Sequence, residues 1–403
     1  MVHKYNRAVR RLLTPTLLCC CLLAAAILAI PAMASAAGIP AVSDADIEQA
    51  LALSGSNRAQ LEDALAQSDG DMLRRNAMRF TVASLPTCDL GSISSAELTG
   101  NLDMALAARN DFAWGDDCDL ATWAHFVLPP RVSQEPLSDW RRFFLAELGN
   151  ELDGATTLEE AAVLVNKWCG QRVGFRQTQR RDQGPLATLA SGYGRCEEMV
   201  IFYVDACRAV GIPARMAYCP YWAVSDNNHA WVEVFGSDGL WHYTGGCEPQ
   251  DQLDDAWFNG AVKNAPLVCS MAFGIPDTRD ETVLEVEETV GARYTRFNST
   301  AFYRDTGLLT VEVPTAAGSE EAHVTVHVFN FGALRQIARV KLDSQGKARI
   351  TLGLGTFVVS TDAAVDNRQT MVEIRPGEIT ELYWDSLPQL DEEILLQFPP
   401  DAA

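Results

Sequence analysis

The sequence has 403 residues, 48% of them hydrophobic and 21% charged, and a formal net charge of −21. These fractions are those of an ordinary globular protein, and the length allows two or three domains with a substantial core. The acidic balance argues against nucleic acid or an anionic membrane surface as a partner, because both require a basic face.

The first 37 residues have the three parts of a secretory signal peptide. A basic start is followed by a mostly apolar stretch over residues 12–30 and by small residues over 31–37 that offer cleavage sites. An uncleaved membrane anchor is the alternative, since the apolar stretch is long enough to span a bilayer. We expect an exported protein (periplasmic, extracellular or at the cell surface) with no membrane segment beyond this N-terminal one.

Helical patterns dominate residues 38–135. Ser43 and Asp46 resemble a capping box, and leucines follow at helical spacing. Prolines near residue 130 predict an extended connector. The next part, 136–276, begins with further helices, one of which is capped by Thr157.

After residue 276 the pattern changes to short strands. Val324, Val326 and Val328 alternate with residues of other character. Several such strands, separated by Gly, Asp and Pro, indicate a β-sandwich over 283–390, followed by a tail over 391–403.

A cysteine opens the most informative segment. Cys196 follows Gly192 and Gly194 and precedes a helical pattern that Gly211 and Pro213 end. The N-terminus of a helix stabilises a thiolate, so this position is predicted to lower the pKa of the thiol. The glycines allow a close backbone approach, and the N–H of Cys196 is a candidate oxyanion donor. A structural or disulfide cysteine is the alternative.

A base for this thiol must be one of the five histidines after residue 37. His229 begins the run His-Ala-Trp-Val-Glu-Val-Phe, and a turn over 238–239 leads to a second strand, which predicts a β-hairpin. A histidine at the mouth of a hairpin packed on the nucleophile helix can reach the sulfur. The alternative is a strand-edge histidine without a partner.

Together these residues resemble the transglutaminase-like superfamily, which has a papain-like thiol fold. The resemblance covers roughly residues 155–260 and rests on Gly-x-Cys opening a helix, Gly-Ile-Pro-Ala-Arg closing it, and Asn-His-Ala-Trp-Val-Glu-Val with a later Trp. In that family the Cys attacks an amide or carboxamide and forms a thioester, the His shuttles the proton, and an Asp orients the His. The resemblance therefore implies Cys196 as nucleophile and His229 as general base.

The orienting Asp is missing from its usual place. A few residues after the hairpin Trp this chain has Thr244 and Gly245, neither of which is acidic. Two glycines could let the backbone bulge so that Glu248 takes this role, and a bacterial subgroup with a Thr-Gly-x-x-Glu-Pro ending supports that assignment. Asp251, or a backbone or amide oxygen, is the alternative.

Other site features are expected as follows. Tyr193, Trp222 and Trp231 are expected to line the cleft, with core packing of Trp222 as the alternative. Neither EF-hand spacing nor close pairs of zinc ligands occur, so no metal and no cofactor are predicted. Cys207 lies on the apolar side of the predicted helix and is expected to be a buried free thiol.

The expected fold is α+β: a helical N-terminal region, a papain-like core with the nucleophile helix packed on an antiparallel sheet, and a C-terminal β-sandwich. The expected function is acyl transfer from a protein or peptide substrate through a Cys196 thioester. Water as acceptor makes a peptidase or amidase, and a lysine amine makes a cross-linking transglutaminase. The alternative is a non-catalytic binding or cell-surface structural protein that keeps the fold. The sequence leaves the oligomeric state open.

Overall fold

The computed structural model describes residues 38–178, 181–276, 282–287, 294–314, 322–363 and 369–387. The expected signal peptide (1–37) and the expected tail (391–403) lie outside these ranges. In the described part, no helix has the length and apolar character of a membrane span. The elements below belong to one compact unit, Ala37–Ala403.

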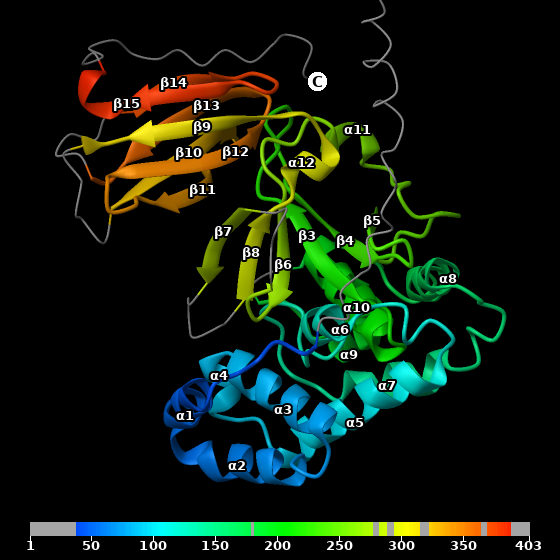
Figure 1. Ribbon diagram of the computed structural model, residues 1–403. Coiled ribbons are helices and arrows are strands. Elements are labelled where there is room, and N and C mark those ends of the chain that lie inside the picture. Colours follow the sequence, from blue (N-terminus) through cyan, green and yellow to red (C-terminus); the bar gives the residue numbers. More distant parts are fainter. Residues whose placement is uncertain are drawn as a thin grey trace, which may run out of the picture. The chain divides into compact units, whose positions relative to one another are not determined.

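Capped helices make up the N-terminal region, as the sequence predicts (Figure 1). Ser43 and Asp46 form the expected capping box, and Ser94 and Glu97 form another. The apolar sides of these helices share a core that includes Phe80. The helices are α1 (Asp44–Leu53), η1 (Gly55–Asn57), α2 (Arg58–Gln67), α3 (Met72–Ser84), α4 (Thr87–Leu90), α5 (Ser95–Asp111) and α6 (Leu120–Phe126).

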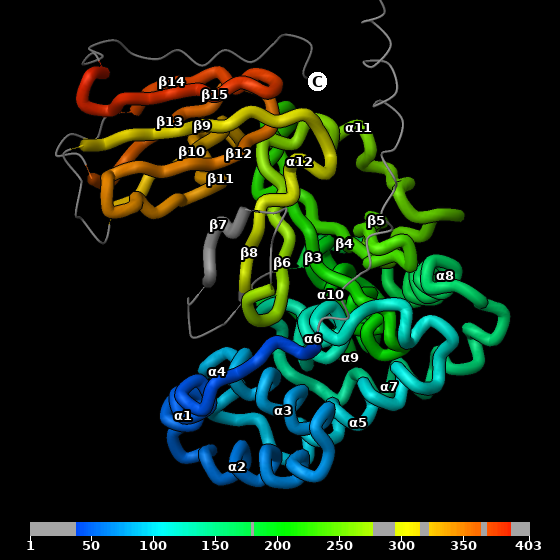
Figure 2. The backbone as a smooth tube through the Cα atoms, viewed as in Figure 1, coloured from blue at the N-terminus to red at the C-terminus, as the bar shows by residue number. Residues whose placement is uncertain are grey.

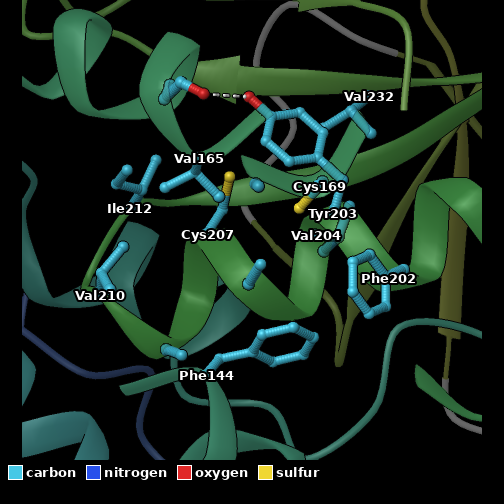
Figure 3. Packing of buried hydrophobic residues seen from close by; sticks show 14 of the residues in the cluster. Phe144, Val165, Cys169, Phe202, Tyr203, Val204, Cys207, Val210, Ile212 and Val232 are labelled. Carbon is cyan, nitrogen blue, oxygen red and sulfur yellow. Dashed lines mark hydrogen bonds between the residues drawn. The ribbon is translucent and has the colours of Figure 1, made fainter. Parts of the chain in front are cut away.

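Helix α10 (Cys196–Ala209) lies at the centre of the next part. Every residue from Glu198 to its end is buried. Phe144 and Val165 of neighbouring helices pack around it, and Cys207 is a buried free thiol within this core, as predicted (Figure 3). The helices in contact with α10 include α5 and three that follow it, namely α7 (Trp140–Leu148), α8 (Leu158–Gly170) and α9 (Pro185–Ser191).

A six-stranded antiparallel sheet, in the order β5-β4-β3-β6-β8-β7, contacts α10 through β3 and β4 (Figures 1 and 2). This arrangement confirms the predicted packing of the nucleophile helix on an antiparallel sheet. The pairing of β3 with β4 places Cys219 opposite His229, where β4 begins. The strands are β3 (Ala214–Cys219), β4 (His229–Phe235), β5 (Trp241–Thr244), β6 (Cys269–Phe273), β7 (Thr282–Glu287) and β8 (Tyr294–Asn298).

Two C-terminal sheets share one apolar core and form the predicted β-sandwich. The valines Val324, Val326 and Val328 are buried and alternate with half-buried residues. All pairs are antiparallel except β9 with β15. The sheets are β11 (Ala333–Lys341), β10 (His323–Asn330), β13 (Gly355–Thr361) and β14 (Gln369–Ile374), and β12 (Lys347–Gly353), β9 (Thr306–Glu312) and β15 (Ile379–Tyr383).

The sandwich begins later than the expected range, 283–390. Strands β7 and β8 pair within the six-stranded sheet, so the sandwich strands start with β9. Short strands of either sheet have the same alternating composition, and composition alone does not assign a strand to one sheet. The remaining described elements are three short helices, α11 (Asn259–Val262), α12 (Thr300–Tyr303) and η4 (Trp384–Ser386), and a parallel pair of two-residue strands, β1 (Gly174–Phe175) and β2 (Tyr193–Gly194).

Charged side chains are buried beside α10. The guanidinium of Arg141 donates to Asn101 Oδ1 at 2.9 Å and to the carbonyl of Arg208 at 2.7 Å. Asp205 of α10 lies near both arginines, but neither of its carboxyl oxygens has a hydrogen-bond partner within the described ranges. Burial, followed by the charge of Glu135, raises the pKa of Asp205 well above its usual range, so this carboxyl is held protonated.

A hairpin turn of the sandwich holds the loop that leads into β4. Asn330, at the end of β10, donates from Nδ2 to the carbonyls of Trp222 and Ser225, both at 2.8 Å. The N–H of Phe331 donates to Asp226 Oδ1 at 2.6 Å. The polar groups of this loop are therefore bonded by residues distant in sequence.

Candidate active site

Glycines shape the turn that presents Cys196. Gly192 follows α9 with a φ of +73°, a left-handed conformation that glycine adopts without strain. At Gly194 an added Cβ would lie 2.9 Å from the Cβ of Glu198, so this close approach requires glycine. Cys196 is the first residue of α10, as predicted.

The buried carboxylate of Glu198 fixes this helix start. It accepts hydrogen bonds from the N–H of Arg195 at 3.0 Å, the N–H of Gln183 at 3.0 Å and the hydroxyl of Thr178 at 2.8 Å. Arg195 also forms an ion pair with Asp182. The segment before the nucleophile is therefore tied to the N-terminus of α10, which leaves Cys196 little freedom of position.

His229 begins β4 beside the thiol. The backbone of Ala230, the next residue, lies near the thiol of Cys196, where its N–H favours the thiolate and so opposes the rise of the pKa. The imidazole is buried, and its Nε2 atom lies 4.0 Å from Glu248 Oε2. Among the described residues this nitrogen has no hydrogen-bond partner. Glu248 thus approaches the imidazole of His229, and the backbone that follows His229 approaches the start of α10.

The turn that carries Glu248 is held from α8. Asn166 donates from Nδ2 to the carbonyl of Gly245 at 2.8 Å. A Cβ on Gly245 would lie 2.5 Å from Glu248 Oε2, and a Cβ on Gly246 would lie 2.8 Å from the Cα of Val200. Both positions therefore require glycine for the carboxylate to approach the core this closely.

Trp257 is a neighbour that the sequence pattern does not reveal. Its indole N–H donates to Glu248 Oε2 at 2.8 Å, and its ring centroid lies 4.8 Å from that of His229. The residue sits in the irregular loop between β5 and α11, where no periodicity or motif signals a contact. A Trp nine residues after Glu248 is the one signal that the sequence offers.

Three expected neighbours of the site are placed differently. Trp222 and Trp231 are buried and stack with ring centroids 6.4 Å apart, so they form core and do not line a cleft. The alternative acid, Asp251, is exposed and pairs with Lys167 at 3.0 Å.

Both reacting groups are neutral at pH 7. Burial, followed by the carboxylate of Glu197 at 3.2 Å from the sulfur, raises the pKa of Cys196 to about 12. Burial lowers the pKa of His229 to about 4. The predicted lowering of the thiol pKa is thus wrong for the free protein, because removal from water and a neighbouring negative charge outweigh the partial charge of the helix N-terminus.

The site contains a thiol at the start of α10, and an imidazole and a carboxyl group 4.0 Å apart. These are the groups that acyl transfer through a thioester requires. In the ranges that the structure describes, no group of three or more His, Cys, Asp or Glu side chains is arranged to hold a metal ion.

Comparisons with known proteins match the part of the chain that holds this site. A family model described as the transglutaminase-like superfamily matches residues 146–244, which include Cys196 and His229. No curated protein sequence matches the chain.

Two solved structures are similar at low identity. A candidate cysteine protease from Cytophaga hutchinsonii is 14% identical with a TM-score of 0.26, over 40% of this chain and 58% of that one. Red sea bream transglutaminase is also 14% identical with a TM-score of 0.26, over 60% of this chain and 58% of that one. The chain therefore spans 58% of the length of each structure.

Proposed function

The chain contains a transglutaminase-like superfamily domain over residues 146–244, and from this premise we propose that it is a thiol enzyme that transfers acyl groups. The acyl donor is an amide or carboxamide of a protein or peptide. Cys196 is the nucleophile, His229 the general base, and Glu248 the acid that orients the imidazole. The approach of Glu248 Oε2 to 4.0 Å from Nε2 of His229 carries the proposal, since it sets a carboxyl group beside the candidate base.

The reaction starts from a neutral thiol and a neutral imidazole. His229 takes the proton of Cys196 as the sulfur attacks the carbonyl carbon, so a preformed thiolate is not needed. The oxyanion of the tetrahedral intermediate accepts a hydrogen bond from the backbone N–H of Cys196. The imidazolium then gives its proton to the departing amine or ammonia, and the acyl group remains on the sulfur as a thioester.

A second nucleophile completes the transfer. Water or a primary amine attacks the thioester while His229 accepts its proton, and the departing sulfur takes a proton back from the imidazolium. Water as acceptor gives a peptidase or amidase, and a lysine amine gives a protein cross-link. The carboxylate of Glu248 stabilises the imidazolium that both halves of the reaction form. The signal-peptide pattern over residues 1–37 supports a location outside the cytoplasm for this reaction.

Acetylation by p-nitrophenyl acetate tests the proposal without the natural substrate. We expect a burst of one p-nitrophenolate per chain, with the acetyl group found on Cys196 by mass spectrometry of the digest. His229→Ala should slow the burst by roughly hundredfold, and Cys196→Ala should abolish it. Cys88→Ala removes an exposed free thiol and should leave the burst unchanged. A burst that His229→Ala does not slow contradicts the proposal.

A non-catalytic binding or structural protein is the second candidate function. The raised pKa of Cys196 favours it, because a protonated thiol is a poor nucleophile unless a base assists it. This alternative expects the acetyl group to appear on Cys196 no faster than on Cys88.

A further inference from the structure

One carboxylate oxygen of the site has two potential donors. Oε2 of Glu248 accepts the indole N–H of Trp257 at 2.8 Å and lies 4.0 Å from Nε2 of His229. A hydrogen bond between nitrogen and oxygen requires roughly 2.7–3.2 Å, so Glu248 is bonded to Trp257 and not to His229. The nitrogen that it fails to reach is buried and has no other partner in the described part of the chain.

We propose that Trp257 is a latch on the candidate site: it holds Glu248 away from His229 in the free protein and releases it when an acyl substrate packs against the indole. This inference rests on the proposed function, because it assigns Glu248 to the orientation of His229. Once released, Oε2 accepts the Nε2–H of His229 and stabilises the imidazolium that forms as Cys196 attacks. The latch therefore keeps the thiol unreactive until a substrate is bound.

Of the two partners, Trp257 has the freer side chain, whereas the backbone that carries Glu248 is held and only its carboxylate has to shift. Trp257 is 64% exposed, so few contacts oppose a change of its side-chain rotamer. The turn before Glu248 is fixed by Asn166 and by the bridge between Gly245 and Glu248. A small shift of the carboxylate, about 1 Å, is enough to close the distance to Nε2.

The exposed indole also indicates the class of substrate. A large exposed aromatic surface beside the candidate base offers an apolar contact at low entropic cost, since its ring has only two side-chain torsions. The ring centroids of Trp257 and His229 are 4.8 Å apart, so a substrate that reaches the imidazole comes close to the indole. An acyl donor with an aromatic or other bulky apolar group is therefore expected to react faster than a small one.

Trp257→Phe tests the latch, because it removes the N–H donor and keeps an aromatic ring. We expect the pKa of His229 to rise, as measured by NMR titration of ring-labelled histidine, with the His229→Ala variant identifying the signal. Acetylation of Cys196 by p-nitrophenyl acetate should become about tenfold faster, the effect of one charge-assisted hydrogen bond gained. Both effects should vanish when Glu248→Gln is added. The ratio of the acylation rate with p-nitrophenyl phenylacetate to the rate with the acetate ester should be larger in the wild type than in Trp257→Phe.

Tyr383→Phe is the matched control. Tyr383 is an exposed aromatic residue whose hydroxyl donates to Glu381 at 3.0 Å in the sandwich, and its loss should change neither measurement. An unchanged His229 titration, or slower acetylation, in a Trp257→Phe protein of wild-type melting temperature overturns the latch. Failure of the proposed function gives a different result: Cys196 is then acetylated at the same rate in His229→Ala and in the wild type.

Discussion

The carboxylate of Glu197 contacts the sulfur of Cys196, the proposed nucleophile. Its Oε2 atom is 3.2 Å from the Cys196 sulfur and 3.2 Å from Nε of Arg195. A negative charge at this distance disfavours the thiolate, so Glu197→Gln is expected to lower the pKa of Cys196 below about 12. Alkylation of Cys196 by iodoacetamide at pH 9, followed by mass spectrometry, should become several-fold faster.

The control for this change is Glu147→Gln, which removes an exposed carboxylate from α7. It should leave the alkylation rate at Cys196 as it is. If Glu197→Gln also leaves the rate unchanged at every pH between 7 and 10, burial alone sets the pKa of this thiol.

Glu248 and Asp251 are the two acids that the sequence offers as orienting groups, and they lie in different surroundings. Glu248 approaches Nε2 of His229, whereas Asp251 is exposed and pairs with Lys167. Glu248→Gln should therefore slow acetylation of Cys196 by roughly tenfold to hundredfold, because the imidazolium loses its stabilising charge. Asp251→Asn should have no effect, and the reverse order of the two rates would make Asp251 the orienting acid.

At the scale of residues, the sequence predicts those site residues that lie in a recognisable local pattern. Cys196 stands between two glycines and a helix, and His229 opens a hairpin strand, so each carries its own pattern. Trp257 acts through its contacts with Glu248 and His229, which cross a loop. These contacts depend on the tertiary fold, which no local pattern encodes.

The start of α10 depends on a buried capping box. Glu198 accepts hydrogen bonds from two backbone N–H groups and one hydroxyl. In Glu198→Gln the side-chain NH2 group is itself a donor, so it would face these donors and could not accept their hydrogen bonds. We expect this variant to lower the free energy of unfolding by about 1–3 kcal/mol and to slow acetylation, because Cys196 is the first residue of the helix. Urea unfolding and the burst rate measure the two effects.

Helix α5 offers a control for this element. Glu97 occupies the same capping-box position but is exposed to solvent, where water can satisfy the freed donors. Glu97→Gln should cost less than about 1 kcal/mol and leave the burst unchanged. Equal costs at the two positions would mean that burial adds nothing to the capping box of α10.

At the scale of elements, side-chain caps and hydrophobic spacing predict the helices well. The capping boxes at Ser43 and the buried face of α10 are visible in the sequence because they are local. The assignment of β7 and β8 to the six-stranded sheet is not local. It depends on the pairing of β8 with β6 and of β7 with β8. The sequence pattern does not reveal these pairings, so it predicts a start of the sandwich that is too early in the chain.

The protonated Asp205 links the stability of the whole molecule to pH. Its pKa is raised on folding, so the folded state keeps a proton that the unfolded state releases above about pH 4. This group therefore contributes most at low pH, and its contribution falls by about 1.4 kcal/mol for each pH unit up to the folded-state pKa. Asp205→Asn removes that dependence, so its stability relative to the wild type should rise between pH 4 and pH 7.

Urea unfolding at pH 4, 5.5 and 7 measures this trend. Asp153→Asn changes an exposed carboxyl and should show a constant difference from the wild type at all three values. A constant difference for Asp205→Asn as well would show that Asp205 is ionised in the folded protein, balanced by Arg141 and Arg208.

The hydrogen bonds of Asn330 bear on how a gene for such a protein could be recombined. The family match ends at residue 244, yet the carbonyl of Trp222 is bonded by a side chain 108 residues further along the chain. A gene fusion that kept only the matched stretch would leave the loop before His229 without these donors. A fusion that preserves these hydrogen bonds therefore has to extend at least to Phe331.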